Sequence, residues 1–262
     1  MLLVIDCGNT NTKFGLLDAV GANAPFLRVF RLDTDSRLRA EDYRTRFDVE
    51  MRNAGFDPGD VTDVAIATVV PNARDALVAF ARGLTDRDPL VIGAAGVALG
   101  LKVLIERPQE AGADRLVAAV AAHAGWPGAK IVLDFGTATT FDVVTADGDY
   151  AGGVIAPGVN LALDALHAGT AQLPRIKVAR PARVIGTGTV AAMESGIYWG
   201  YVGMVEGIVA RIRAEYGNQP FTVIATGGLA ALFAEGTGVI DATDPELTLR
   251  GIALVHQINR PQ

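Results

Sequence analysis

A short pattern that occurs twice, about half a chain apart, constrains the fold most. Each copy has two apolar residues, an aspartate, any residue, a glycine, and then Asn or Thr: Val4-Ile5-Asp6-Cys7-Gly8-Asn9 and Val132-Leu133-Asp134-Phe135-Gly136-Thr137. The two aspartates are 128 positions apart, and so are the two glycines. Apolar runs interrupted by turn residues are typical of two strands joined by a tight loop. A single D-x-G is a common turn sequence, so the paired spacing is what predicts a duplicated α/β fold with two facing lobes.

Both loops are suited to phosphate chemistry. Each directs a carboxylate, hydroxyl groups and backbone N–H groups to one place, where a phosphate and its metal ion fit. Lys13 follows the first loop and can reach a β- or γ-phosphate as a point charge. A third glycine turn, Thr226-Gly227-Gly228, follows a predicted strand at 221–225 and suits an adenine, because side chains are absent there. We expect an N-terminal lobe at 1–121 and a C-terminal lobe at 122–262, which includes the adenosine-side turn.

Composition narrows the functional class. The chain has 262 residues, a net charge of −6 and one cysteine, Cys7, so it cannot form an internal disulfide. A disulfide-free chain suits a reducing compartment. No apolar segment approaches the roughly 20 residues of a membrane span, and the N-terminus does not resemble a signal peptide. These features predict a cytoplasmic protein without a membrane or nucleic-acid partner; the acidic charge disfavours nucleic acid but allows a phosphorylated small molecule.

Asp114 and Arg115 precede an alanine-rich predicted helix at 116–124. An aspartate at a helix start is often an ordinary cap. In phosphoryl transfer, a carboxylate also orients the accepting hydroxyl, and an arginine can clamp a substrate carboxylate. The local pattern leaves both interpretations open.

Other chemistries have weaker support. The three histidines His123, His167 and His256 are scattered, without the spacing of metal ligands. Cys7 is more simply a small buried thiol than an activated nucleophile. Neither G-x-G-x-x-G nor G-x-x-x-x-G-K-[ST] occurs, so neither a Rossmann site nor a P-loop is indicated.

Periodicity predicts helices at 37–55, 75–84, 160–171 and 245–259, and a long helix at 190–215 that Thr189 could cap. The long helix carries glycines near helical spacing, namely Gly196, Gly200, Gly203 and Gly207. Each interior glycine destabilises a helix by about 1 kcal/mol relative to alanine, so this number of them indicates close packing. The packing partner is either a second copy of the chain or another part of the same one.

Taken together, these segments resemble the type III pantothenate kinases, a family within the superfamily of acetate and sugar kinases, heat-shock chaperones and actin. The matching segments occur in family order and cover almost the whole chain: IDCGNTNTKFG (5–15), GADRLVAAVAAH (112–123), VLDFGTATTFDVV (132–144), GGVIAPG (152–158), ESGIYWGYVGMVEGIV (194–209) and VIATGGLA (223–230).

The resemblance implies two ribonuclease-H-like lobes around a central cleft (the actin-like ATPase fold) and a homodimer. It also implies ATP-dependent phosphorylation of pantothenate to 4'-phosphopantothenate, the first step of coenzyme A biosynthesis, with Mg²⁺ accompanying ATP. By the same resemblance, Asp134 binds a monovalent cation, K⁺ or NH4⁺, and Asp114 is the catalytic base. The ATP-binding residues would be Asp6, Cys7, Gly8, Asn9, Thr10, Asn11, Thr12, Lys13 and Thr137. The pantothenate-binding residues would be Gly112, Ala113, Asp114, Arg115 and Thr189.

The sequence departs from the family pattern near the expected substrate pocket. Many members have a tyrosine and an Asn-Pro where this chain has Ile105 and Arg107-Pro108, and many have Asn where Ala118 stands. These differences keep two alternatives open. One is a kinase of another small hydroxy compound on the same fold, and the other is a nucleotide-binding regulatory homologue that transfers no phosphate.

Overall fold

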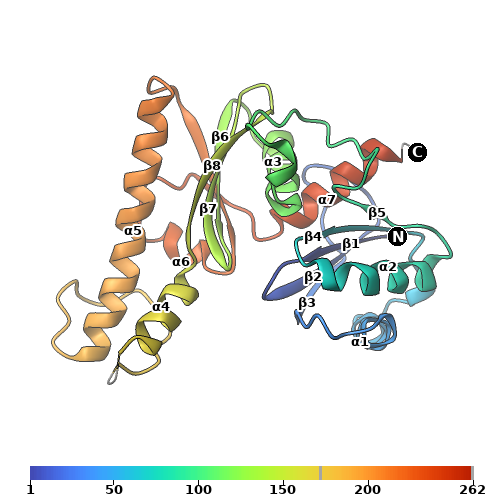
Figure 1. Ribbon diagram of the computed structural model, residues 1–262, viewed down its shortest axis with the longest axis horizontal. Helices are drawn as coiled ribbons and strands as arrows, with labels where there is room; N and C mark the ends of the chain where they lie inside the picture. The colour runs from blue at the N-terminus through green and yellow to red at the C-terminus, as the bar shows by residue number, and fades with distance from the viewer. Residues whose placement is uncertain (171–172, 261–262) are drawn as a thin grey trace. The chain divides into compact units, whose positions relative to one another are not determined.

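The computed structural model describes residues 1–170 and 173–260, and the chain forms two compact units. Unit 1 comprises residues 1–125 together with the chain from 247 onward, and unit 2 comprises residues 126–246. Figure 1 shows that each unit is built on its own sheet, with helices packed against it.

The sheet of unit 1 has the order β3-β2-β1-β4-β5. Its strands are β1 (Leu2–Cys7), β2 (Asn11–Leu17), β3 (Arg28–Asp33), β4 (Asp63–Thr68) and β5 (Leu90–Val91). The first three strands pair antiparallel, whereas β1 with β4 and β4 with β5 pair parallel. Parallel strands buried on both faces are apolar almost throughout, and β1 is such a strand.

Four helices cover the two faces of this sheet (Figure 1). On one face, α1 (Ala40–Asn53) and α2 (Pro71–Thr85) pack against alternate residues of β1, including Leu3 and Ile5. On the other face, α3 (Ala113–Gly125) and α7 (Leu247–Asn259) pack against Leu2 and Val4. The remaining helical segments of unit 1 are the short 3₁₀ turns Pro58–Asp60 and Pro108–Glu110.

The contact between α3 and α7 is unusually close. A Cβ atom at Gly251 of α7 would collide with the carbonyl oxygen of Val117 of α3. Glycine lets the two backbones approach to this distance, so α7 fixes the position of α3. This matters for function, since the first turn of α3 carries Asp114.

The sheet of unit 2 repeats the arrangement of unit 1. Its order is β10-β9-β6-β7-β8, with three antiparallel strands on one side and parallel additions on the other. The strands are β6 (Ala129–Phe135), β7 (Ala138–Val144), β8 (Tyr150–Pro157), β9 (Phe221–Gly227) and β10 (Ala242–Thr243). Counted within each unit, both sheets have the order third, second, first, fourth, fifth strand. The predicted duplication is therefore confirmed.

One face of this second sheet is covered by α5 (Thr189–Glu215), whose residues Tyr198 and Val205 pack against Leu133 and Phe135 of β6. Unit 2 also contains α4 (Val159–Ala168) and the five-residue α6 (Ala230–Ala234). The helix predicted at 160–171 thus ends earlier, although residue 171 itself lies outside the described residues.

The units differ from the predicted lobes in one element. The expected boundary lies at 121/122 with the C-terminal helix in the second lobe, but α7 belongs to unit 1. The reason is its apolar face, since Leu249 and Ile252 pack beside Leu2, Val4 and Val117. Among the helices of the described chain, none is both long and apolar enough to cross a membrane.

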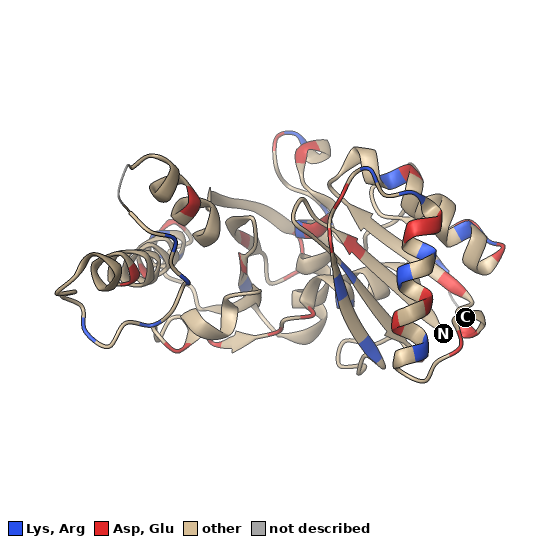
Figure 2. Cartoon of the chain, turned by 90° about the horizontal axis from the view of Figure 1, so that it is seen from below, with Lys and Arg blue, Asp and Glu red and all other residues tan. Residues whose placement is uncertain are grey.

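Charged residues of both signs alternate along the helices of unit 1. Figure 2 shows Lys and Arg interspersed with Asp and Glu over the helices of unit 1, without a continuous basic face. Several surface pairs are of opposite sign, such as Arg44 with Asp48 at 2.8 Å and Arg28 with Glu50 at 3.0 Å. Nucleic-acid binding usually requires a basic patch or stripe, and this face of the protein shows none.

Candidate active site

The first loop, which we define as residues 8–10, joins β1 to β2. The N–H of Gly8 donates to the carbonyl oxygen of Asn11 at 3.0 Å, which closes a tight turn. Asn9 and Thr10 are exposed at its tip, and Asp6 is half-buried at its base. Lys13 lies directly opposite Asp6 on β2, so both side chains project from the same face of the sheet. A carboxylate, an ammonium group and loop amides therefore lie close together.

Two of the predicted ATP-binding residues point into the core. The Cys7 side chain is fully buried and packs with Ile5 and Phe14, as expected for a small buried thiol. Thr12 is also fully buried, with its hydroxyl 3.4 Å from the Cys7 sulfur. Beneath them lies Tyr43 of α1, and burial raises the pKa of its phenol. Cys7 and Thr12 can thus contact a ligand only through their backbone.

The segment Gly112 to Arg115 forms the start of α3. The backbone N–H of Arg115 donates to Oδ1 of Asp114 at 2.9 Å. This oxygen lies so close to Gly112 that a Cβ atom at position 112 would collide with it. Glycine at 112 therefore permits this conformation of Asp114. The N-terminal end of a helix carries partial positive charge from its free N–H groups, and the Asp114 carboxylate lies at that end of α3.

Unit 1 brings this segment and the first loop to the same edge of its sheet. The N–H of Val69, just after β4, donates to the carbonyl oxygen of Cys7 at 3.2 Å. The Val69 side chain in turn lies 3.6 Å from the position of a Cβ on Gly112. This edge is the carboxyl end of the parallel strands β1 and β4, where α/β proteins usually bind their ligands.

The second loop, residues 136–137, joins β6 to β7 in unit 2. Gly136 donates its N–H to the carbonyl oxygen of Ala138 at 3.0 Å, and the side chain of Thr137 is exposed. This loop is one residue shorter than the first, although the strands on either side match. Thr137 is thus presented on an open turn, as a phosphate contact requires.

Asp134 lies half-buried at the base of the second loop. Its strand neighbours are Thr140 of β7 and Thr226 of β9, both in direct register. The Thr226 hydroxyl is buried and has no hydrogen-bond partner. A Cβ atom at Gly227 would collide with Oδ1 of Asp134 and lie 2.6 Å from the carbonyl oxygen of Phe135. The third glycine turn therefore packs against the Asp134 carboxylate.

This oxygen-rich position fits a cation. Within the described residues, no group of three or more His, Cys, Asp or Glu side chains could hold a metal ion. A site dominated by carboxylates is therefore absent from that part of the chain. One carboxylate and a hydroxyl without a partner instead offer oxygen ligands with a single formal negative charge. Oxygen atoms of this kind are able to hold a cation.

Thr189 is the first residue of α5 and not its cap. The N-cap is Gly188, and no side chain caps this helix, so the predicted capping role is wrong. The extended backbone of Gly188 takes the cap position one residue earlier. Thr189 instead lines an open apolar hollow of about 600 Å³ in unit 2, together with Leu166, Leu173, Ala192, Met193, Gly196 and Ile197.

The departures from the family pattern occupy ordinary structural positions. Arg107 forms an exposed ion pair with Glu110 at 2.8 Å, and Ile105 is half-buried. Ala118 is buried within α3, where its methyl group fits the core. None of the three disturbs the conformation of Asp114 within unit 1.

Sequence reasoning missed Thr34, and it gave Gly158 and Thr226 no role beside these loops. Thr34 and Gly158 each contact a loop from the end of a third strand, and Thr226 contacts the Asp134 position through strand register. Gly158 carried a signal, as the last residue of a glycine-rich segment. Thr226 was named only as part of the third glycine turn, and its register with Asp134, like the bonds of Thr34, depends on strand pairing that no local pattern reveals.

Comparison with known proteins identifies the family. The model of the family described as type III pantothenate kinase matches residues 2–211. The chain is 50% identical over 262 residues to the type III pantothenate kinase of Rhodospirillum centenum, and the aligned region covers 99% of each protein. It is also 50% identical over 259 residues to the type III pantothenate kinase of Paramagnetospirillum magneticum, with 99% and 98% covered.

Solved structures share the fold at low sequence identity. The activator of the 2-hydroxyisocaproyl-CoA dehydratase from Clostridium difficile, with bound ADPNP, has a TM-score of 0.55 and 10% identity over 98% of this chain and 94% of its own. The inorganic polyphosphate/ATP-glucomannokinase from Arthrobacter sp. strain KM has a TM-score of 0.50 and 14% identity over 99% of both chains. These structures support the duplicated actin-like ATPase and sugar kinase fold. By the family model and its full-length relatives, the chain belongs to the type III pantothenate kinase family.

Proposed function

We propose that this protein transfers the γ-phosphoryl group of ATP to the hydroxyl of pantothenate and thereby forms 4'-phosphopantothenate, the first step of coenzyme A biosynthesis. One observation carries the proposal. The Asp114 carboxylate, at the N-terminal end of α3, shares a sheet edge with the first loop, which is suited to phosphate. A base and a phosphate site on one edge are what phosphoryl transfer to an alcohol requires.

In this proposal Asp114 accepts the proton of the pantothenate hydroxyl. The hydroxyl oxygen then bonds to the γ-phosphorus, the bond to the bridging oxygen breaks, and its electron pair leaves with ADP. Arg115 pairs with the pantothenate carboxylate, because a guanidinium group recognises a carboxylate in two-point geometry. The backbone of Gly112 and Ala113 lines the same position, and Thr189 supplies a further substrate contact.

The ATP phosphates are held by two sets of groups. The first comprises Asp6, Lys13 and the backbone amides between them, and the second is Thr137. Mg²⁺ accompanies ATP, as it does in kinases generally, and neutralises the charge that develops on the phosphates. Magnesium is usually bound through one or two carboxylates plus substrate phosphates, and Asp6 is suitably placed for this.

A monovalent cation, K⁺ or NH4⁺, would be held by Asp134 and the Thr226 hydroxyl. The support is the buried hydroxyl without a partner beside a carboxylate, with no carboxylate cluster in the described chain. When bound, such a cation would supply positive charge beside Asp134.

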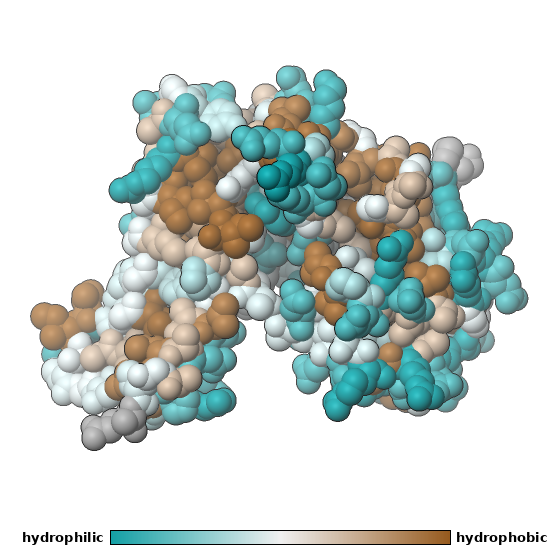
Figure 3. Space-filling view, viewed as in Figure 1, coloured by the Kyte–Doolittle hydropathy of each residue, from teal (hydrophilic) through white to brown (hydrophobic). Residues whose placement is uncertain are grey.

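A homodimer formed through α5 is part of the proposal. Cβ atoms added at Gly196, Gly200 or Gly203 would meet nothing within 4 Å, so this face of α5 is not packed within the described chain. Figure 3 shows apolar surface on unit 2 along and beside α5. A glycine-lined helix face of this kind allows two helices to pack closely. We further propose a cytoplasmic location, which the single buried cysteine supports.

A coupled assay that detects ADP tests the function. Purified protein is supplied with ATP, Mg²⁺, K⁺ and either pantothenate or a panel of other small hydroxy acids and sugars. We expect pantothenate to be the preferred acceptor. Preference for another acceptor would instead establish the alternative kinase, and ATP binding without turnover on any acceptor would establish a regulatory homologue. The panel of acceptors is included because the chain departs from the family pattern at Ile105 and Arg107, near the expected substrate pocket.

A further inference from the structure

Both loops are held by the same backbone hydrogen bond. In unit 1, the N–H of Thr34 donates to the carbonyl oxygen of Thr10 at 2.9 Å. In unit 2, the N–H of Gly158 donates to the carbonyl oxygen of Thr137 at 3.1 Å. Thr34 directly follows β3, and Gly158 directly follows β8, each the third strand of its sheet. The acceptors are also equivalent, since each is the last residue of its loop.

A second carbonyl of each loop faces the same residue. The Thr34 hydroxyl donates to the carbonyl oxygen of Gly8 at 2.7 Å. In unit 2, a Cβ atom on Gly158 would lie 2.6 Å from the carbonyl oxygen of Gly136 and would collide with that of Thr137. Two carbonyls of each loop thus converge on one residue that lies outside the loop.

This convergence determines where the loop amides point. In a trans peptide unit the C=O and the following N–H point in opposite directions. Because the carbonyls of Gly8 and Thr10 both turn towards Thr34, the N–H groups of Asn9 and Asn11 both turn away from it. Both N–H groups are therefore directed to the side of the loop away from Thr34, where an anion can accept from them. In unit 2, the same argument turns the N–H of Ala138 away from Gly158.

Thr34 also connects the first loop to the core. Its hydroxyl lies 2.9 Å from that of Thr12, which is fully buried. A hydroxyl has only one hydrogen, and that of Thr34 is used on Gly8. The Thr12 hydroxyl also lies 3.4 Å from the Cys7 sulfur, so polar contacts lead from the first loop through Thr34 and Thr12 to the core. Gly158 makes the matching connection in unit 2, since it is also the N-cap of α4.

We infer that Thr34 and Gly158 are equivalent positioning residues of the two phosphate loops. Each holds loop carbonyls away from the ligand and so directs loop amides at the phosphates of ATP. This inference rests on the proposed function of the loops as ATP sites. It assigns no contact with ATP to either side chain.

Thr34→Val tests the role of the hydroxyl. Valine keeps the branched shape and the backbone N–H but can neither donate to Gly8 nor make the polar contact with Thr12. Loss of one such hydrogen bond should weaken binding of a non-hydrolysable ATP analogue with Mg²⁺ about 5- to 10-fold and raise the KM for ATP similarly. The KM for pantothenate should not change, because the hydrogen bonds of Thr34 go to the first loop and its other polar contact is with Thr12. Thr34→Ser, which retains the hydroxyl, should stay within about 2-fold of the wild type.

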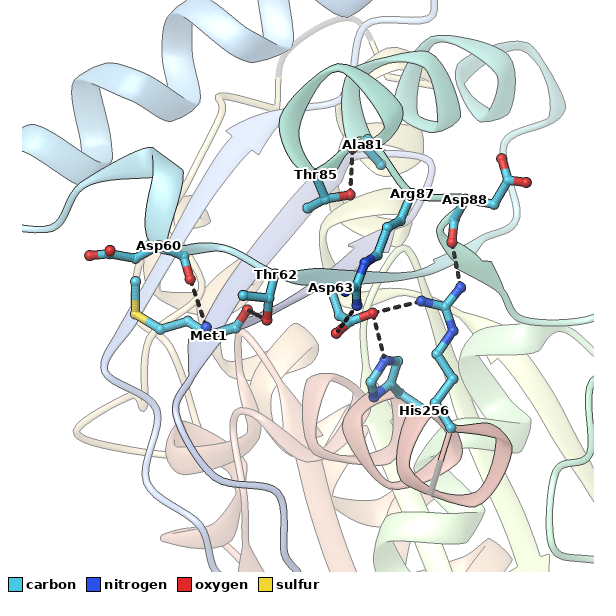
Figure 4. Close-up of polar contacts among 10 residues, drawn as sticks. Met1, Asp60, Thr62, Asp63, Ala81, Thr85, Arg87, Asp88 and His256 are labelled. Atoms are coloured by element: carbon cyan, nitrogen blue, oxygen red, sulfur yellow. Dashed lines mark hydrogen bonds and ion pairs between the residues drawn. The ribbon is translucent and has the colours of Figure 1, made fainter. Parts of the chain in front are cut away.

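Thr85→Val is the matched control. The Thr85 hydroxyl, drawn in Figure 4, also donates to a backbone carbonyl, that of Ala81, at 3.2 Å, and Thr85 is likewise half-buried. It is the last residue of α2. This variant should lose some thermal stability and keep wild-type affinity for the ATP analogue.

A purely structural role of Thr34 would give a different result. Thr34→Val would then lower the melting temperature and the active fraction, as Thr85→Val does, while the KM for ATP and the affinity for the analogue stayed at wild-type values. That result overturns the inference. If wild-type protein binds no ATP analogue, the proposed function fails as well, so the two failures are distinguishable.

Gly158→Ala provides a second test that does not depend on the folding of Thr34→Val. The added methyl group must displace the second loop, because it would overlap the Thr137 carbonyl. Affinity for the ATP analogue should fall at least about 10-fold, and a Gly169→Ala control, near the end of α4, should leave it unchanged. Wild-type affinity in folded Gly158→Ala protein would overturn the equivalence of the two residues.

Discussion

Thr226 lies directly beside Asp134 on the neighbouring parallel strand, and its buried hydroxyl has no hydrogen-bond partner. Burying an unpaired polar group costs about 1 to 3 kcal/mol. A bound cation would turn this cost into a ligand interaction. The pair therefore links the stability of unit 2 to the cation that we propose.

Thr226→Val should separate the cost of burying the unpaired hydroxyl from the stabilisation by a bound cation. Without K⁺, the variant should be as stable as the wild type or more stable by about 1 kcal/mol, because it buries no unpaired hydroxyl. The increase in melting temperature that K⁺ produces in the wild type should be strongly reduced. Thermal unfolding in choline chloride and in KCl measures both quantities. Thr222→Val, on the same strand and face, is the control, and an equal K⁺ effect in all three proteins would exclude Thr226 as a ligand.

Gly251→Ala should destabilise unit 1. The added methyl group would overlap the carbonyl of Val117 and force α7 away from α3. Overpacking of this kind typically costs about 1 to 3 kcal/mol, which urea unfolding would detect. Activity per folded molecule should also fall, because α3 carries Asp114. Full stability would show that the two helices are not in close contact.

Stability should depend on pH through His256, which α7 holds near Asp63. Its Nε2 is 3.9 Å from Oδ1 of Asp63, which also pairs with Arg260 at 2.6 Å, while Arg87 is 3.5 Å from Oδ2 (Figure 4). Burial lowers the pKa of His256 below its usual 6.5, and Arg260 adds to this, against the opposing effect of Asp63. The unfolded chain therefore binds more protons below pH 6.5, and stability is lost as the pH falls from there through the folded-state pKa.

Urea unfolding of the wild type and of His256→Gln at several pH values between neutral and mildly acidic measures this effect. The neutral glutamine should give a shallower loss of stability over the same range. Identical pH profiles would mean that other groups account for the acid sensitivity.

Replacement of Gly200 by arginine should yield a monomer. Its position on the exposed glycine face of α5 lets the large side chain be accommodated in a single chain but not between two closely packed helices. Light scattering would measure the mass, with Ala146→Arg, in the exposed turn between β7 and β8, as a control for the added charge. A dimeric Gly200→Arg protein would place the interface elsewhere.

The local parts of this fold could be predicted from the sequence, and the long-range parts could not. The D-x-G loops were predictable, because an apolar strand, a turn and a second strand leave a pattern within about 14 residues. The placement of α7 in unit 1 was not, since it depends on Gly251 meeting Val117, far away in the chain. Thr34 escaped for the same reason, because its bonds to the first loop span 24 and 26 residues and leave no trace around position 34.

The segment of Asp114 and Arg115 shows most clearly what could not be predicted from the sequence alone. At the sequence level, a helix-capping aspartate and a catalytic base were equally compatible with the pattern. The structure adds that Asp114 accepts the N–H of the next residue and lies over Gly112, at the edge that carries the first loop. That position is compatible with a catalytic base. The spacing of residues in the sequence does not show that Asp114 and the first loop lie at the same edge of the sheet.

The most direct test of the central claim is the kcat of Asp114→Asn with pantothenate, measured beside Glu110→Gln, an exposed change four residues away. If Asp114 is the base, kcat should fall about 10²-fold or more, because the amide cannot accept the proton. ATP-analogue affinity should remain, and Glu110→Gln should retain wild-type turnover. A kcat of Asp114→Asn within a few-fold of the wild type would contradict the account.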